Sequence, residues 1–375
     1  MADTLAAGFN VFTGTWFAGS APAQVELTVI DWLRQICGLP EGAGGLLVSG
    51  GSMANLTGLA VARHVKLGDN LDGAVAYISD QCHSSVARAL RVLGLSSDRV
   101  RLVQATDEYR MSVDALRAQI AADRSAGLRP FCVVANAGST NTGAVDRLRE
   151  IADLCRAEDM WLHVDGAYGG MLAIVPEYRS VLAGTDQADS LVVNPHKWLF
   201  TPFDCSAFFV KRPDVLKRAF SLVPEYLVTR EQDEVVNYMD YGVQLGRRFR
   251  ALKLWMVIRA FGVDGLIERL REHCALAREL ASSIEASDDW ELMAPVPFSL
   301  VCFRFAPRGT SEAERDRLNE SIMHAVNATG DAFLSHTKVH DRFTLRVAIG
   351  NLRTDERHVA LVWDRLHSCA ASLSV

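Results

Sequence analysis

Short apolar segments that alternate with helical patterns are the feature of this sequence that limits its fold most strongly. Residues 45–51 and 74–80 have the composition of buried strands, and helical patterns follow them at 52–68 and 83–94. Further strands are expected at 129–140, 160–170, 189–198 and 205–212, with a helix at 145–159. Apolar strands that alternate with helices are typical of a largely parallel sheet with helices on both faces. The pattern therefore predicts an α/β fold.

Chemically reactive or small residues follow five of these strands. They occupy the turns at 49–52, 82–83, 138–140, 165–167 and 194–197. In open parallel sheets, ligands bind beyond the carboxyl ends of the strands. We therefore expect these turns to meet at one crevice.

A different pattern begins after residue 242. Helices are expected at 243–261 and 263–286, two strands within 291–307, a helix at 311–328, a strand at 343–351 and a last helix at 354–373. This order predicts a smaller C-terminal α+β domain. We expect an N-terminal segment at 1–44, a large domain at 45–262 and the small domain at 263–375.

Composition excludes several classes of function. The 375 residues are 49% hydrophobic and 22% charged with a net charge of −6, and no basic run suggests a nucleic-acid or membrane surface. No apolar run approaches the roughly 20 residues of a membrane helix, and the N-terminus lacks the pattern of a signal peptide. The eight cysteines form no CxxC pair, which disfavours a metal site and suits a reduced, cytoplasmic protein.

One lysine stands in an apolar setting, in the segment LVVNPHKWLF at 191–200. Lysine usually keeps its amine in water. Apolar surroundings would lower the pKa of Lys197, and the neutral amine is a nucleophile that forms Schiff bases with carbonyl groups. A lysine that merely extends from a strand end into solvent is the alternative.

Asp165 ends another apolar strand, in WLHVDGAYGG at 161–170. A carboxylate in such a place needs a partner. Pyridoxal 5′-phosphate (PLP) pairs its protonated ring nitrogen with a fixed carboxylate and binds a lysine through its aldehyde. Lys197 and Asp165 together therefore indicate PLP, although a turn or cap carboxylate explains Asp165 taken alone.

The turn Ser49-Gly50-Gly51-Ser52 precedes a predicted helix. Glycines let backbone N–H groups approach an anion, and a helix N-terminus attracts one. The turn matches neither G-x-G-x-x-G nor the P-loop. We expect it to bind the phosphate of the cofactor, with an ordinary capped turn as the alternative.

Three more polar residues follow predicted strands and could contact the cofactor. The imidazole of His83 could stack on the ring, Thr140 could hydrogen-bond the ring or the phosphate, and Asn194 could bind the phosphate. Each is an ordinary structural residue when taken alone. Their order along the chain with Asp165 and Lys197 is far more specific.

At these residues the chain resembles the PLP-dependent group II amino-acid decarboxylases, nearest to the aromatic-L-amino-acid decarboxylase branch. The resemblance extends from about Gly8 to residue 370 and is most specific around Lys197. The segments that carry it are DQCHSSVARA (80–89), WLHVDGAYGG (161–170), ADSLVVNPHKWLFTPFDCSAFFVK (188–211), VPEYL (223–227), LGRRFRALKLW (245–255) and FTLRVAIGN (343–351).

The resemblance implies a role for each site residue. Lys197 forms the internal aldimine, Asp165 holds the ring nitrogen, and His83 and Ala167 cover the two faces of the ring. Tyr226, in a mobile loop, protonates the carbanion that remains after CO2 leaves. The remaining cofactor contacts are implied at Gly50, Gly51, Ser52, Thr140, Asn194 and His196.

The resemblance also implies the architecture and the reaction. The fold is that of fold type I PLP enzymes, similar to aspartate aminotransferase, with 45–262 as the PLP-binding domain. The enzyme is a carboxy-lyase that converts an L-amino acid into an amine and CO2 through an external aldimine and a quinonoid. It is implied to be a homodimer, with residues 1–44 packed on the large domain or on the partner.

Two departures from the family concern the substrate. The sequence starts after a helical N-terminal segment that relatives use in the dimer and in the substrate pocket, so it is a truncated form, a fragment or a member without that segment. The pocket segment FNVFTGTWF at 9–17 also differs from that of the animal enzymes, although its Phe12 and Trp16 suit an aromatic substrate, so the substrate stays open.

Other functions remain open at this point. The chain could decarboxylate glutamate, a diamino acid or another non-aromatic substrate, or could be a PLP-dependent aldehyde synthase. It could also be a low-activity homologue that serves as a binding partner. A nicotinamide oxidoreductase is disfavoured, because no G-x-G-x-x-G follows any predicted strand.

Overall fold

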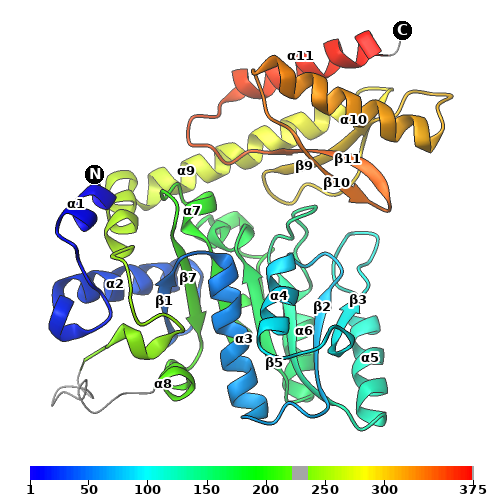
Figure 1. Ribbon diagram of the computed structural model, residues 1–375. Helices are drawn as coiled ribbons and strands as arrows, with labels where there is room; N and C mark the ends of the chain where they lie inside the picture. The colour runs from blue at the N-terminus through cyan, green and yellow to red at the C-terminus, as the bar shows by residue number, and fades with distance from the viewer. Residues whose placement is uncertain (222–234, 374–375) are drawn as a thin grey trace. The chain divides into compact units, whose positions relative to one another are not determined.

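The computed structural model describes residues 1–221 and 235–373, which form two compact units (Figure 1). The first unit contains Met1–Thr106, Arg110–Gly138 and Val145–Leu266. The second contains Asp107–Tyr109, Ser139–Ala144 and the chain from Ile267 onward. Two short segments from the middle of the sequence thus belong to the unit that is otherwise C-terminal.

A seven-stranded sheet forms the centre of the first unit. Its strands are β1 (Gly44–Val48), β2 (Ala74–Ser79), β3 (Val100–Val103), β4 (Arg129–Asn136), β5 (Trp161–Gly166), β6 (Ser190–Val193) and β7 (Ser206–Val210), in the order β1-β7-β6-β5-β4-β2-β3. Only β7 pairs antiparallel with its neighbours, so the other six strands run in one direction. Their carboxyl ends meet at one edge, and the predicted mostly parallel α/β fold is confirmed.

Helices surround this sheet. They are α1 (Ala2–Gly8), α2 (Trp16–Ile36), α3 (Gly51–Leu67), α4 (Ser84–Val92), α5 (Val113–Ser125), α6 (Leu148–Ala157), α7 (Pro195–Trp198) and α8 (Asp214–Phe220). Short 3-10 helices occupy Ser97–Arg99, Gly169–Ile174, Pro176–Tyr178, Thr185–Gln187 and Tyr238–Tyr241. The sequence analysis did not predict α1, α2, β3, α5 or α8. In α2, Gly19 has non-helical dihedral angles and Pro22 lies inside the helix, which hides the helical pattern.

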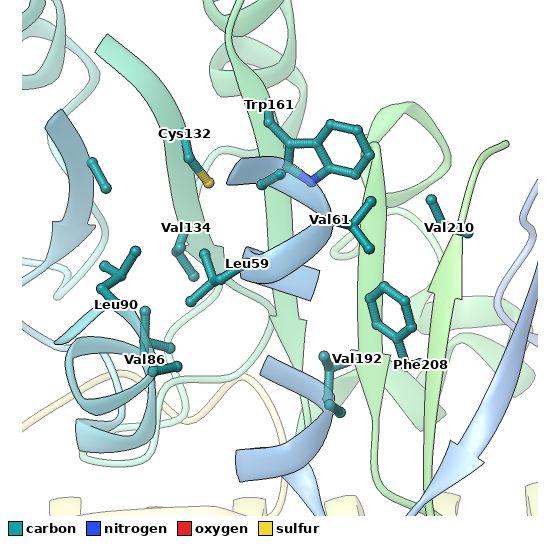
Figure 2. Packing of buried hydrophobic residues seen from close by; sticks show 14 of the residues in the cluster. Leu59, Val61, Val86, Leu90, Cys132, Val134, Trp161, Val192, Phe208 and Val210 are labelled. Atoms are coloured by element: carbon teal, nitrogen blue, oxygen red, sulfur yellow. The ribbon is translucent and has the colours of Figure 1, made fainter. Parts of the chain in front are cut away.

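Helix α3 covers β4 to β7 and supplies much of the core (Figure 2). Leu59 and Val61 are fully buried among strand residues such as Val134 and Val192. Burial of each such side chain stabilises the fold by about 1.5–3 kcal/mol. The helix is thereby fixed against the sheet, and its N-terminus lies at the carboxyl edge of the strands.

A buried ion pair fastens α2 to the sheet. Glu26 Oε1 accepts hydrogen bonds from Arg247 Nη2 at 2.5 Å and from the backbone N–H of Leu47 in β1 at 2.9 Å. Arg247 Nη2 also donates to the carbonyl of Leu47 at 2.8 Å, and the guanidinium lies 4.6 Å from the ring centroid of Tyr238. Both charged side chains are almost completely buried, so each depends on the other to offset the loss of hydration.

The second unit is an α+β domain, as predicted. An antiparallel sheet has the order β10-β11-β9-β8, with β8 (Trp290–Leu292), β9 (Leu300–Phe305), β10 (Ser335–Val339) and β11 (Arg342–Ala348). Its helices are α10 (Glu312–Thr329), α11 (Glu356–Leu373) and the later part of α9 (Ala251–Glu285). The two helices predicted at 243–261 and 263–286 appear as α9, interrupted at Gly262 with φ 67°, but residues 243–250 are not helical. A capping box between Ser311 and Glu314 starts α10.

Two further observations concern the described part of the chain. None of its helices is long and apolar enough to cross a membrane, and it contains no group of three or more His, Cys, Asp or Glu residues arranged to hold a metal ion. All eight cysteines are free thiols.

Candidate active site

Strand β5 presents polar groups on one face at every second position. Trp161, His163 and Asp165 alternate with the apolar residues Leu162 and Val164. Side chains two residues apart in a strand point to the same face. His163 and Asp165 therefore share one face, and both contact α3 through hydrogen bonds.

Asp165 is held by two N–H donors at the carboxyl end of β5. Asn55 Nδ2, from the first turns of α3, donates to Oδ2 at 2.9 Å, and the backbone N–H of Ala167 donates to Oδ1 at 3.0 Å. The side chain is 6% exposed. Donors on both oxygens compensate for the lost hydration and fix the plane of the carboxylate.

The same amide connects Asp165 with His83. Asn55 Nδ2 also donates to Ser85 Oγ at 3.0 Å, and Ser85 Oγ lies 2.8 Å from His83 Nδ1. The backbone N–H of Ser85 donates to His83 Nδ1 at 3.1 Å, so this nitrogen accepts and the proton belongs on Nε2. His83 caps α4, and its side chain is exposed at the site.

His163 is a buried residue of the site that the sequence analysis did not single out. Its Nε2 lies 3.0 Å from Asn55 Oδ1, and its Nδ1 lies 2.7 Å from Ser190 Oγ. Burial lowers the pKa of His163 to about 4, against a smaller opposite effect of the Asp165 charge, so the ring is neutral near pH 7. Trp161 Nε1 donates to the same Ser190 hydroxyl at 2.9 Å. The alternation of Trp161, His163 and Asp165 in the sequence was the signal that could have identified it.

The predicted phosphate turn lies at the N-terminus of α3. A Cβ placed on Gly51 would lie 3.0 Å from Asn194 Nδ2 and 3.7 Å from the Cβ of Ala167, so these residues from three segments meet. The N-cap is Gly50, which has no side chain to occupy the first N–H groups of the helix. Ser52, in the first turn, is exposed. We call Gly50, Gly51 and Ser52 the cradle. It combines helix N–H groups that lack a side-chain cap with a small, open surface, which suits an anion.

Asn194 has a polar atom without a partner. The side chain is 2% exposed, and within the described residues no hydrogen bond reaches its Oδ1. Rotation of the amide exchanges Oδ1 and Nδ2, so the same position can present a donor. A buried amide atom without a hydrogen-bond partner needs one, and a phosphate oxygen bound next to Gly51 would supply it.

Lys197 lies in α7, directly after β6, with its backbone N–H bonded to Asn194 O at 2.9 Å. The lowered pKa expected for Lys197 agrees with the structure. Trp198 and Leu199 turn into the core, whereas the Lys197 side chain remains open to solvent. Nearby protein atoms still displace part of the water around the amine, and this desolvation lowers the pKa of Lys197, opposed by the Asp165 charge.

His196 fastens the lysine segment to the neighbouring strand. The backbone N–H of Cys205 donates to His196 Nδ1 at 3.0 Å, and the backbone N–H of His196 donates to the carbonyl of Cys205 at 3.1 Å. Burial lowers the pKa of His196, with a smaller contribution from the Lys197 charge. The half-buried ring is therefore a neutral group beside the lysine, with Gly50 nearby.

The remaining predicted site residues have different surroundings. Thr140 belongs to the second unit, where its carbonyl accepts a hydrogen bond from Arg346 Nη2 at 2.5 Å. Phe12 is 39% exposed, and Trp16 is half-buried against the core of the first unit. Tyr226 lies outside the described residues.

The residues that the structure brings together fit PLP. Asp165 is oriented by N–H donors at the same sheet edge as Lys197, and the Lys197 amine has a lowered pKa. The cradle at Gly51 and the unpartnered amide atom of Asn194 supply a place for a phosphate. The ring nitrogen, the aldehyde and the phosphate of PLP thus each have a suitable protein group, namely Asp165, Lys197 and the cradle with Asn194.

We predict opposite effects from two glycine-to-alanine changes in helices. In Gly58→Ala, the new Cβ would lie 2.5 Å from His163 Cε1 and 3.0 Å from Phe208 Cε2, so the buried ring must shift at a cost of about 1–3 kcal/mol. In Gly265→Ala, the nearest atom is Phe261 Cβ at 3.8 Å, so alanine should stabilise α9 by about 0.5–1 kcal/mol. Urea unfolding of both variants measures the difference; equal stabilities would contradict the tight packing at His163.

Comparison with known proteins identifies relatives along the whole chain. Residues 1–306 match the family described as the pyridoxal-dependent decarboxylase conserved domain. The chain is 40% identical over 378 residues to an aromatic-L-amino-acid decarboxylase of Bacillus atrophaeus, with 100% of this chain and 79% of the relative covered. It is 36% identical over 387 residues to a phenylacetaldehyde synthase of Arabidopsis thaliana, with 100% and 79% covered.

A solved structure agrees with these relatives. The crystal structure of Oryza sativa TDC with PLP and tryptamine has a TM-score of 0.95 and 34% sequence identity, covering 99% of this chain and 80% of that chain. Fold, cofactor chemistry and sequence thus lead to the same group of enzymes. The chain belongs to the family of PLP-dependent amino-acid decarboxylases, which are carboxy-lyases of fold type I.

Proposed function

We propose that this enzyme decarboxylates an aromatic L-amino acid, such as tyrosine, DOPA, tryptophan or phenylalanine, to the amine and CO2. The observation that carries the proposal is the Asp165 carboxylate, held by two N–H donors at the sheet edge that also bears Lys197. The aromatic specificity is supported by the similarity to the aromatic-L-amino-acid decarboxylase. Phe12 and Trp16 are the proposed aromatic residues of the pocket.

The proposed roles follow from the chemistry of each group. Bound PLP supplies an electron-accepting ring, which makes loss of CO2 from an attached amino acid feasible. Lys197 would hold the cofactor at its aldehyde carbon, and a lowered pKa favours the reactive neutral amine. Asp165 pairs with the ring nitrogen, while His83 and Ala167 cover the two faces of the ring.

The phosphate is proposed to lie at the start of α3. Its contacts are the backbone of Gly50, Gly51 and Ser52, together with the side chain of Asn194. The dipole of a 17-residue helix favours an anion at this end. His196 keeps the segment before Lys197 in place, and Thr140 is proposed to contact the ring.

Three further features belong to the proposal. Tyr226 delivers a proton to the carbon that has lost its carboxylate. The enzyme forms a homodimer in the cytoplasm, and the exposed apolar side chains of Phe9 (79% exposed) and Phe17 (94% exposed) support a partner surface at the N-terminal helices.

A substrate panel tests the proposed reaction. We expect the PLP-loaded enzyme to release CO2 and the matching amine from aromatic amino acids at least tenfold faster than from glutamate or diamino acids, since apolar pockets exclude charged side chains. Amine, CO2, aldehyde and oxygen consumption are measured together. Faster turnover of a non-aromatic substrate would overturn the assignment of the substrate.

Aldehyde synthesis is the second candidate, because a phenylacetaldehyde synthase is among the similar proteins. This reaction also releases CO2, but it consumes oxygen and water and gives aldehyde, ammonia and hydrogen peroxide in place of the amine. The variant Tyr226→Phe, compared with wild type on the same panel, should keep PLP binding and shift the product from amine to aldehyde. Unchanged amine production by this variant would contradict the proton-donor role of Tyr226.

A further inference from the structure

A chain of hydrogen bonds joins the two side chains that are proposed to contact the PLP ring. From His83 it passes through Ser85 and Asn55 to Asp165, with donor–acceptor distances of 2.8, 3.0 and 2.9 Å. Asn55 is the central member and is 1% exposed. It occupies the second turn of α3, beyond the backbone groups proposed for the phosphate.

The donors and acceptors around Asn55 require one orientation of its amide. Nδ2 has two hydrogens, and they meet Asp165 Oδ2 and Ser85 Oγ. The remaining atom, Oδ1, faces His163 Nε2 at 3.0 Å. With the amide reversed, a carbonyl oxygen would face the carboxylate and an N–H group would face another N–H group, and both contacts are repulsive.

His163 supplies the donor that this orientation of the Asn55 amide requires, and its other ring nitrogen has a suitable partner in Ser190. Trp161 can only donate, so its Nε1–H occupies one acceptor site of Ser190 Oγ at 2.9 Å. Because Asn55 Oδ1 can only accept, His163 Nε2 must carry the proton that it donates to Asn55, and His163 Nδ1 must accept. The Ser190 hydroxyl, at 2.7 Å, supplies the donor for Nδ1. The register of β5 and β6 pairs His163 with Ser190, so the backbone itself places these hydrogen-bonding groups next to each other.

Close packing removes the space in which the network could rearrange. Gly58 lies one turn after Asn55 on α3, and a Cβ at that position would lie 2.5 Å from the His163 ring. A glycine inside a helix is unfavourable by about 1 kcal/mol relative to alanine. Its presence here allows α3 to approach β5 closely enough for Asn55 to reach both Asp165 and His163.

We propose that Asn55 is a positioning residue for PLP, which aligns Asp165 with the ring nitrogen and His83 with the ring face, and that His163 fixes its amide. The inference rests on the proposed roles of Asp165 and His83. It adds that the two contacts are aligned by one shared amide, so that removal of this amide disturbs both.

The first experiment compares Asn55→Ala with Thr57→Val in the PLP-loaded enzyme. Thr57 is a matched control: it is buried on the same helix, and among residues 1–221 and 235–373 its hydroxyl bonds only the carbonyl of Met53 at 2.8 Å. PLP labelled with nitrogen-15 at the ring nitrogen reports the pH midpoint of ring protonation by NMR. PLP affinity is measured by titration of the apoprotein, and thermal unfolding of the apoproteins verifies that they fold.

Asn55→Ala should weaken PLP binding about tenfold, as expected for one lost hydrogen bond to a charged group, and lower the midpoint of ring protonation by about one pH unit. Thr57→Val should change neither value. Asp165→Asn is the reference for the proposed function: if it leaves the midpoint unchanged, the role of Asp165 fails. If Asp165→Asn lowers the midpoint while Asn55→Ala leaves midpoint and affinity as in wild type, the positioning role of Asn55 is overturned.

The second experiment tests the orientation of the amide through His163. In His163→Gln, the new amide retains an N–H group that can donate to Asn55 Oδ1, whereas His163→Leu has a similar volume and no donor. The glutamine variant should keep the ring-protonation midpoint and PLP affinity within twofold of wild type, and the leucine variant should resemble Asn55→Ala. Equal values for the two His163 variants would contradict the role of His163, because a purely structural effect would change both alike.

Discussion

Replacement of Lys197 by alanine is expected to reduce turnover by more than about 10³-fold, the upper part of the range for a single proton-transfer group. The lysine is proposed to hold the cofactor covalently and to carry a proton beside the reacting carbon, so that two functions are lost together. Its side chain is exposed, which allows a substrate to approach, while nearby protein atoms desolvate the amine and lower its pKa. No other lysine is described in the segments around Asp165, Asn194 and the N-terminus of α3.

The measurement combines kinetics with covalent labelling. Borohydride treatment of the PLP-loaded wild type should fix the cofactor on Lys197, which peptide mass spectrometry can locate, and the variant should retain no cofactor after the same treatment. Lys211→Ala is the control, because Lys211 is an exposed lysine at the end of β7. Cofactor fixed on another residue of the wild type, or normal turnover by Lys197→Ala, would refute the assignment.

Replacement of Glu26 by alanine is expected to destabilise the first unit by about 3–5 kcal/mol, because Arg247 would remain buried with its charge uncompensated. The Leu47 N–H in β1 would lose its acceptor in the same change. A domain is typically stable by only about 5–15 kcal/mol. The loss should therefore appear as a fall in melting temperature of roughly 10 °C.

A surface ion pair on the same helix provides the control. Asp31 bonds Arg34 at 2.8 Å, and its side chain is 53% exposed. Exposed pairs of this kind contribute about 0–1 kcal/mol, so Asp31→Ala should change the melting temperature little. If both variants melt together, the Glu26–Arg247 pair does not have the proposed importance. PLP affinity, measured below the transition, separates this loss of stability from a defect in the site.

Much of the fold was predictable because the hydrophobic pattern is regular where the sheet is buried. The strands that end at Ser79, Asn136 and Gly166 are buried along almost their whole length, and their apolar runs identify them. By contrast, β3 is a four-residue edge strand with Leu102 61% exposed, so its sequence carries little signal. The sequence analysis predicted a second unit but not that Ser139–Ala144 belong to it. Tertiary contacts group these residues with the second unit, and no local sequence pattern encodes such contacts.

The site was predicted where the chemistry of a residue type is distinctive. Lys197 and Asp165 follow strands whose carboxyl ends lie at one edge, as the sequence indicated. Asn55 and Ser85 were missed because asparagine and serine are common near helix starts, and only the packing of α3 on β5 gives them a shared partner. The lowered pKa of Lys197 was predictable from its apolar neighbours, although Trp198 and Leu199 themselves turn into the core and the lysine side chain is exposed.

The reversed direction of β7 has a consequence for how the reactive lysine is mounted. In an ordinary crossover, the residues after a strand are positioned by the helix that follows. Here β6 and β7 are adjacent and antiparallel, so residues 194–205 form a hairpin loop whose two ends are one strand spacing apart, about 4.8 Å. Two hydrogen bonds between His196 and Cys205 join the two ends of this loop. The short helix α7 that carries Lys197 is thus held between two adjacent strands, and a change in the pairing of β6 with β7 would move the amine directly.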